Sequence, residues 1–105
     1  MIIGVLKELA PETRVSLVPE VVAAVPKLTV MLDGGVRRGT HVLKALALGA
    51  RCVFVGRPMY YAVASGGVPT AQHAMRLLAD ELDRDMALLG IARLNELDAS
   101  FVTRA

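Results

Sequence analysis

A strand–helix–strand pattern in the middle of the chain restricts the possible fold more than any other feature. Thr29–Leu32 is a short apolar run that predicts a buried strand, and Cys52–Val55 predicts a second one. Between them, Thr40 is suited to cap a helix that runs to Leu48 and is terminated by Gly49. Two strands joined through one helix are normally parallel, with a right-handed connection. The pattern therefore predicts an α/β fold with a short parallel sheet.

A glycine-rich turn that carries an arginine follows each of these strands. The first turn, DGGVRRG, spans residues 33–39 and contains Arg37, and the second is Gly56-Arg57-Pro58, which opens another helix. Glycine lets backbone N–H groups approach a ligand closely, and N–H groups at strand ends and helix starts attract anions. An arginine can add two hydrogen bonds to a phosphate. The two turns therefore predict one phosphate site, the alternative being ordinary turns with solvated arginines.

The N-terminal quarter of the chain predicts one more strand and one more helix. Met1–Leu6 is apolar and typical of a strand, and the polar run Lys7–Arg14, which contains Pro11, predicts a loop. A helix is expected over Pro19–Val25, with Pro19 in its first turn.

The C-terminal half is predicted to be helical. Pro58 opens a short helix that ends by Gly66-Gly67, and Thr70 is suited to cap a longer helix over Ala71–Leu89 that stops at Gly90. One more helical turn is expected at Leu94–Leu97. Apolar residues recur along the long helix at helical spacing and are expected to lie in the core: Ala71, Ala74, Met75, Leu78, Leu82, Met86 and Leu89.

Composition argues against several other classes of protein. Hydrophobic residues make up 54% of the chain and the net charge is only +2. Nucleic-acid binding is not expected, because the basic residues are neither clustered nor interleaved with aromatics.

Cys52 is expected to be a small buried hydrophobic residue, and no metal-ligand grouping is evident. No apolar run reaches the roughly 20 residues of a transmembrane helix, and no secretory signal begins the chain, so a cytoplasmic location is expected.

The two turns and the helix between them resemble a known enzyme signature. The runs LDGGVRRGT (32–40), KALALGA (44–50) and VFVGRP (53–58) are similar to the C-terminal end of FMN-dependent 2-hydroxy-acid oxidoreductases, the family of glycolate oxidase, L-lactate dehydrogenase and mandelate dehydrogenase. The resemblance covers residues 28–103 and implies the last two βα units of a TIM barrel. By the resemblance, Asp33 holds the ribityl chain of FMN, and the FMN phosphate is bound by Gly35, Arg37, Gly56 and Arg57.

The chain also departs from the pattern of this family. His41 stands where the family commonly has an acidic residue, and little effect on phosphate binding is expected from it. The family abstracts a substrate proton with a histidine in a His-Gly-x-Arg motif that precedes the strand carrying Asp33. No histidine precedes Asp33 here, and neither His41 nor His73 is followed by Gly-x-Arg. No catalytic residue is therefore assigned, and the chain by itself is expected not to oxidise a 2-hydroxy acid such as lactate.

Residues 1–27 have a different resemblance. The runs IGVLKE (3–8) and ETRVSLVP (12–19) are similar to the N-terminus of alanine dehydrogenase and of the transhydrogenase α subunit. In alanine dehydrogenase the arginine matching Arg14 binds a substrate carboxylate, but a solvated or structural role is expected here. We accordingly divide the chain into segments 1–27 and 28–105. A natural fusion, a decayed gene and an engineered reading frame are the alternative origins of this junction.

Two interpretations of the whole chain follow. In the first, it is a part of an FMN-dependent oxidoreductase that keeps the phosphate-binding end. In the second, it is a non-catalytic α/β fragment that forms homo-oligomers through open sheet edges, because so few strands cannot close a barrel of about eight. Bound flavin would distinguish the two.

Overall fold

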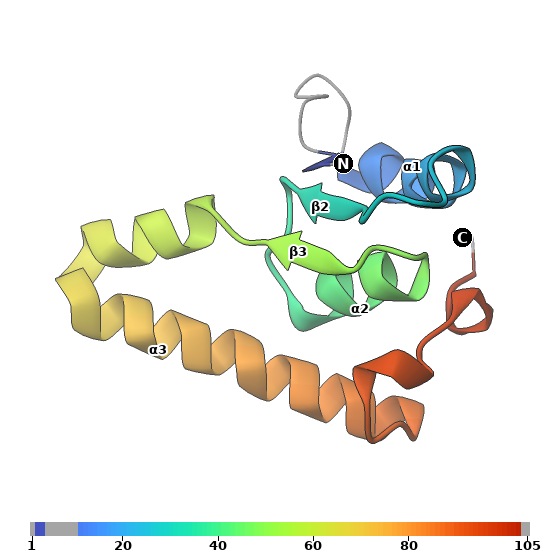
Figure 1. The fold of residues 1–105 in the computed structure, drawn as a ribbon. Coiled ribbons are helices and arrows are strands. Elements are labelled where there is room, and N and C mark those ends of the chain that lie inside the picture. The colour runs from blue at the N-terminus through green and yellow to red at the C-terminus, as the bar shows by residue number, and fades with distance from the viewer. Residues whose placement is uncertain (1, 4–10, 104–105) are drawn as a thin grey trace.

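The computed structural model of the chain describes residues 2–3 and 11–103 and shows a three-stranded parallel sheet with helices around it (Figure 1). The strands lie in the order β1, β2, β3, and each pairs in parallel with the next. The elements are, in chain order, β1 (Ile2–Ile3), α1 (Pro11–Ala24), β2 (Met31–Asp33), α2 (Gly39–Ala47), β3 (Cys52–Phe54), α3 (Arg57–Leu89) and two 3₁₀ turns, η1 (Leu94–Glu96) and η2 (Ala99–Phe101). The α/β class and the short parallel sheet predicted from the sequence are confirmed.

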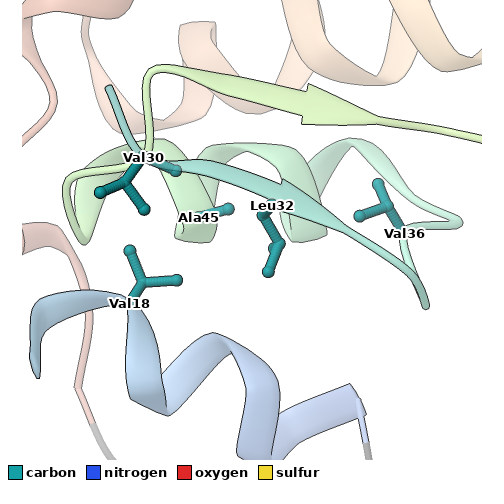
Figure 2. Packing of buried hydrophobic residues seen from close by; sticks show 6 residues of the cluster. Val18, Val30, Leu32, Val36 and Ala45 are labelled. Atoms are coloured by element: carbon teal, nitrogen blue, oxygen red, sulfur yellow. The ribbon is translucent and has the colours of Figure 1, made fainter. Parts of the chain in front are cut away.

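The core lies between one face of the sheet and the helices α1 and α2 (Figure 2). Leu32 of β2 is 1% exposed. It packs in one cluster with Val18 of α1, with Ala45 of α2 and with Val30, which precedes β2. Val36, in the turn after β2, belongs to the same cluster. Burying an aliphatic side chain of this size contributes about 1.5–3 kcal/mol, so this cluster positions the turn relative to the sheet.

The opposite face of the sheet is not covered by the described residues. Side chains alternate between the two faces of a strand, and the register pairs Met31 with Cys52 and Asp33 with Phe54, so these four share the second face. Cys52 is exposed and Phe54 is 43% exposed. The prediction that Cys52 is buried is therefore wrong, because its apolar run forms a strand with one covered face and not a strand buried on both faces.

The first helix is longer than the sequence predicted. The expected strand Met1–Leu6 contains β1, and its other residues lie outside the described part of the chain. The loop expected over Lys7–Arg14 is wrong for residues 11–14, because α1 already begins at Pro11, a residue type suited to the first helical turn. Pro19 lies inside α1 and not at its start. The neighbouring Val18 is 0% exposed, and its burial offsets part of the cost of an interior proline.

The helix between the two turns starts two residues earlier than expected. The residue that precedes α2 is Arg38, and the hydroxyl of Thr40 does not cap the helix. The C-terminal end of α2 lies where the sequence predicted it. Leu48 is the C-cap residue, and Gly49 follows with a φ of 111°. The strand predicted over Thr29–Leu32 is likewise shifted, to Met31–Asp33.

The long helical segment α3 is bent where the sequence places two glycines. Gly66 and Gly67 have non-helical backbone angles, and Figure 1 shows the chain changing direction there. Thr70 lies within the helical segment after the bend, so the cap expected from it is not observed. Gly90 ends α3 with a φ of 75°, as predicted. The turn expected at Leu94–Leu97 is present as η1.

The second half of α3 packs against α2, but only along part of its expected core stripe. No described residue of α3 is fully buried, and Met75 and Leu89 are 62% and 40% exposed. The two helices lie close together at Gly39, where an added Cβ would be 2.9 Å from the backbone nitrogen of Leu82. Although α3 is long, none of the described helices combines the length and apolar character needed to cross a membrane.

Candidate functional site

The two glycine–arginine turns lie at the same edge of the sheet. β2 ends at Asp33 and β3 ends at Phe54, and the register pairs these two residues directly. Because the strands are parallel neighbours, residues 34–38 and Gly56-Arg57 leave the sheet from adjacent strand ends. The juxtaposition expected from the sequence is therefore present in the structure.

The backbone of the first turn depends on two glycines. Gly34 and Gly35 have φ angles of 97° and 79°, a region that other residues rarely adopt. Val36 follows them and is 4% exposed, so its side chain fixes the turn to the core. The next side chain, Arg37, is exposed. The turn thus presents a side-chain-free backbone next to a cationic side chain.

The second turn is the start of a helix. Gly56 is the residue before α3, and Arg57 and Pro58 are its first two residues. The Gly56 carbonyl accepts the N–H groups of Met59, over 3.0 Å, and of Tyr60, over 3.1 Å, and Pro58 has no N–H, so the N–H of Arg57 precedes the first of these helical bonds. A Cβ built on Gly56 would meet nothing within 4 Å, so the space beside it is open. Arg57 is exposed at this helix start, where the helix dipole favours an anion.

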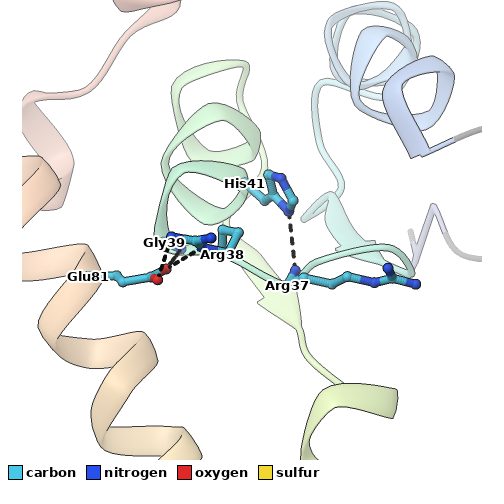
Figure 3. A network of polar contacts seen from close by, with 5 residues as sticks. All are labelled: Arg37, Arg38, Gly39, His41 and Glu81. Atoms are coloured by element: carbon cyan, nitrogen blue, oxygen red, sulfur yellow. Dashed lines mark hydrogen bonds and ion pairs between the residues drawn. The ribbon is translucent and has the colours of Figure 1, made fainter.

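The two adjacent arginines of the first turn have different roles. Arg38 forms an ion pair with Glu81 of α3, with 2.9 Å between Nη2 and Oε1 and 3.1 Å between Nε and Oε2. Arg37 points away from this pair, as Figure 3 shows, and no described carboxylate forms an ion pair with it. Of the two, Arg37 is therefore the one whose guanidinium no described carboxylate engages.

Glu81 also occupies the start of α2. Its Oε2 accepts the backbone N–H of Gly39 over 2.9 Å, which satisfies one of the N–H groups that a helix leaves without a partner (Figure 3). The hydrogen bond from Gly39, followed by that from Arg38, holds the pKa of Glu81 below its ordinary value of 4.5. Sequence reasoning missed this role, since no local pattern connects residues 42 positions apart. The N–H of Gly39 at the start of α2 is thus already bonded within the chain.

His41 contacts the first turn from within α2. Its Nδ1 accepts the backbone N–H of Arg37 over 3.2 Å, and its ring is partly buried. The contact was not predicted, although the sequence analysis singled out His41 as a departure from the family pattern. Asp33 lies at the end of β2 on the uncovered face of the sheet and is partly buried.

The pKa of Glu81 makes stability depend on pH. A carboxyl whose pKa is lowered by folding contributes stability above its unfolded value of 4.5, and the contribution is lost as the pH falls below that value. We expect thermal unfolding of the wild type to lose more stability between about pH 5 and pH 3 than Glu81→Gln does, because the lowered pKa places the loss below 4.5. Glutamine keeps an acceptor for Gly39 but does not titrate.

Asp83→Asn is the matched control, because it removes an exposed carboxylate from the same helix. It should keep the acid sensitivity of the wild type. Equal acid sensitivity in the wild type and Glu81→Gln would contradict the capping role of Glu81.

Known proteins are similar to this chain over most of its length. An L-lactate oxidase of Nostoc sp. is 49% identical over 85 residues, which are 80% of this chain and 23% of that protein. The glycolate oxidase of Spinacia oleracea is 44% identical over 92 residues, 88% of this chain and 25% of that protein. The flavin-binding domain of baker's yeast flavocytochrome b2 superposes with a TM-score of 0.78 at 40% identity, covering 83% of this chain and 24% of that one.

The chain spans about a quarter of the length of these relatives. The family model for FMN-dependent dehydrogenases matches residues 10–104 and so begins well before residue 28. It includes α1, whose Val18 shares the core with β2 and α2. Arg14 lies in α1, and its side chain is outside the described part of the structure. The similarity of residues 1–27 to alanine dehydrogenase, and the division at residue 27, stay predictions. The match over most of its length shows that the chain belongs to the FMN-dependent dehydrogenase family.

Proposed function

We propose that this chain forms the phosphate-binding end of the FMN site in a 2-hydroxy-acid oxidoreductase. The observation that supports the proposal is the pair of glycine turns at adjacent ends of parallel strands, each with an exposed arginine. Gly35 and Arg37 on the first turn, with Gly56 and Arg57 on the second, bind the phosphate. Asp33, at the end of β2, holds the ribityl chain. The sheet then represents the last two βα units of a TIM barrel.

The residues present suit a phosphate group. Gly34 and Gly35, which have positive φ angles, carry no side chains that would cover the backbone of the first turn. The space next to Gly56 is open. Arg37 and Arg57 supply charge that no described carboxylate neutralises. When bound, FMN supplies the electron acceptor for oxidation of an L-2-hydroxy acid to a 2-oxo acid. The residues of this chain contribute the anchoring of FMN, and proton abstraction is not assigned to any of them.

The complete reaction is proposed from the relatives and not from the site itself. The relatives named above include a lactate oxidase and a glycolate oxidase, so a small L-2-hydroxy acid is the proposed substrate of the whole enzyme. No histidine precedes Asp33 in this chain, and the base that such an oxidation requires is absent from the two turns. The location proposed for the protein is the cytoplasm.

Phosphate-led binding predicts a preference for FMN over riboflavin. Arg37→Ala should weaken FMN binding at least tenfold, or about 1.4 kcal/mol, because a charge-assisted hydrogen bond contributes roughly 1.5–3 kcal/mol. Riboflavin, which lacks the phosphate, should bind much more weakly than FMN and should not respond to Arg37→Ala. Calorimetric titration at two salt concentrations checks both points, since added salt should weaken FMN binding.

Arg51→Ala is the matched control for the loss of one positive charge. Arg51 is also exposed but precedes β3, at the end of the strand away from the turns. It should leave FMN binding nearly unchanged. Riboflavin binding as tight as FMN binding, or equal losses in Arg37→Ala and Arg51→Ala, would refute a phosphate site at the turns.

A second property, self-association, is favoured by the uncovered face of the sheet. β3 has no neighbour on its outer side among the described strands, and Phe54 is exposed on the open face. Unpaired strand edges and exposed apolar side chains promote association. We therefore propose that copies of the chain form homo-oligomers through β3 and its open face.

Light scattering at tens of micromolar protein tests this association, because oligomers form by mass action and depend on protein concentration. The wild type should exceed the mass of one chain, and Phe54→Lys should shift it toward a monomer. Tyr60→Lys is the control, because Tyr60 is a 75% exposed aromatic residue on α3 and not on the sheet. A monomeric wild type, or dissociation by Tyr60→Lys alone, would contradict association through the sheet.

A further inference from the structure

We propose that His41 is a positioning residue of the first turn, which the neutral imidazole holds in place and the protonated imidazole releases. The inference rests on the proposed phosphate site, because it concerns the backbone that presents Arg37. The observation that carries it is the hydrogen bond from the Arg37 N–H to His41 Nδ1, at 3.2 Å (Figure 3).

The contact requires one particular form of the imidazole ring. A neutral imidazole has one donor and one acceptor nitrogen, so acceptance at Nδ1 places the proton on Nε2. A protonated imidazole has two donors and no acceptor. Protonation of His41 would therefore bring two N–H groups together and break the bond to Arg37. Val36 fixes the middle of the turn to the core, and the bond to His41 holds the next backbone N–H along the chain.

The position of His41 in α2 explains why it reaches the turn. It is the third residue of the helix, from which a side chain can fold back to the backbone that precedes the helix start. Glu81 serves the neighbouring Gly39 N–H from the other side of the helix start, as Figure 3 shows. The two side chains thus hold consecutive parts of the same segment, one from within α2 and one from α3.

Among the described residues, no acceptor other than His41 Nδ1 bonds to the Arg37 N–H. The turn and α2 contribute the cations Arg37, Arg38 and Lys44, and Asp33 lies before the turn at the end of β2. From α3, Glu81 is bound to Arg38 and Gly39, and Asp85 lies at Gly39. The other elements that pack against α2 carry, among described side chains, Glu20 on α1, Cys52 on β3 and Asp98 before η2, the last bound to Ser100.

Nuclear magnetic resonance of the ligand-free full chain tests the contact directly. The Arg37 amide resonance should shift when acidification adds a proton to the imidazole. His41→Asn should abolish this shift, because the Asn Oδ1 is an acceptor that does not titrate. His73→Asn is the matched control, since His73 is an exposed histidine on α3, and it should leave the Arg37 titration intact.

Titration with FMN at about pH 8, where histidine is neutral, tests the consequence for binding. His41→Ala should bind FMN roughly threefold to tenfold more weakly than the wild type, the effect of one hydrogen bond, while His41→Asn should restore most of the affinity. An Arg37 amide that does not titrate, or that titrates equally in His41→Asn, would overturn the proposal, as would wild-type affinity in His41→Ala. If the wild type binds no FMN, the proposed function fails, while the amide titration still decides the role of His41.

Discussion

Parallel pairing of β2 with β3 is the constraint on which the candidate site depends. It sends the chain out of the sheet twice at the same edge, so two turns 20 residues apart in the sequence become neighbours. The helix α2 makes this possible, because a parallel connection must return to the opposite end of the sheet before the next strand begins. Val18, Leu32 and Ala45 stabilise that return by packing α1, β2 and α2 together. A change that loosened this core would displace both turns.

Glu81 adds a second constraint from a distant part of the chain. It bonds to Arg38 and Gly39 at once, so one carboxylate links the end of the first turn, the start of α2 and the side of α3. The missing side chain at Gly39 is what allows α3 to come this close. The result is a division of roles between two adjacent arginines. Arg38 is paired with Glu81, whereas Arg37 is exposed and has no described carboxylate as a partner.

Local signals in the sequence predicted the parts of the structure that depend on local geometry. The turns after β2 and β3, the helix ends at Gly49 and Gly90, and the bend at Gly66-Gly67 follow from the conformational freedom of glycine. The arginines were also found, because charge next to glycine-rich backbone is visible in the sequence. Their roles in binding FMN stay a prediction.

The errors arose where contacts between distant residues decide the outcome. Thr40 was expected to cap α2, but Glu81 supplies the acceptor from α3. Cys52 was expected to be buried, but its face of the sheet has no covering layer in the described part of the chain. The loop predicted around Pro11 underestimated how strongly the packing of Val18 favours a helix. None of these contacts leaves a periodic or local pattern in the sequence.

The central claim is that both turns bind one phosphate, and a double-mutant cycle on FMN affinity tests it most directly. Arg37→Ala, Arg57→Ala and the double variant would be titrated with FMN under identical conditions. If both side chains contact the same group, each single change should weaken binding, and their effects should be coupled by about 0.5–3 kcal/mol. Effects that add to within about 0.3–0.5 kcal/mol, or an Arg57→Ala variant that binds as the wild type does, would contradict a shared phosphate site.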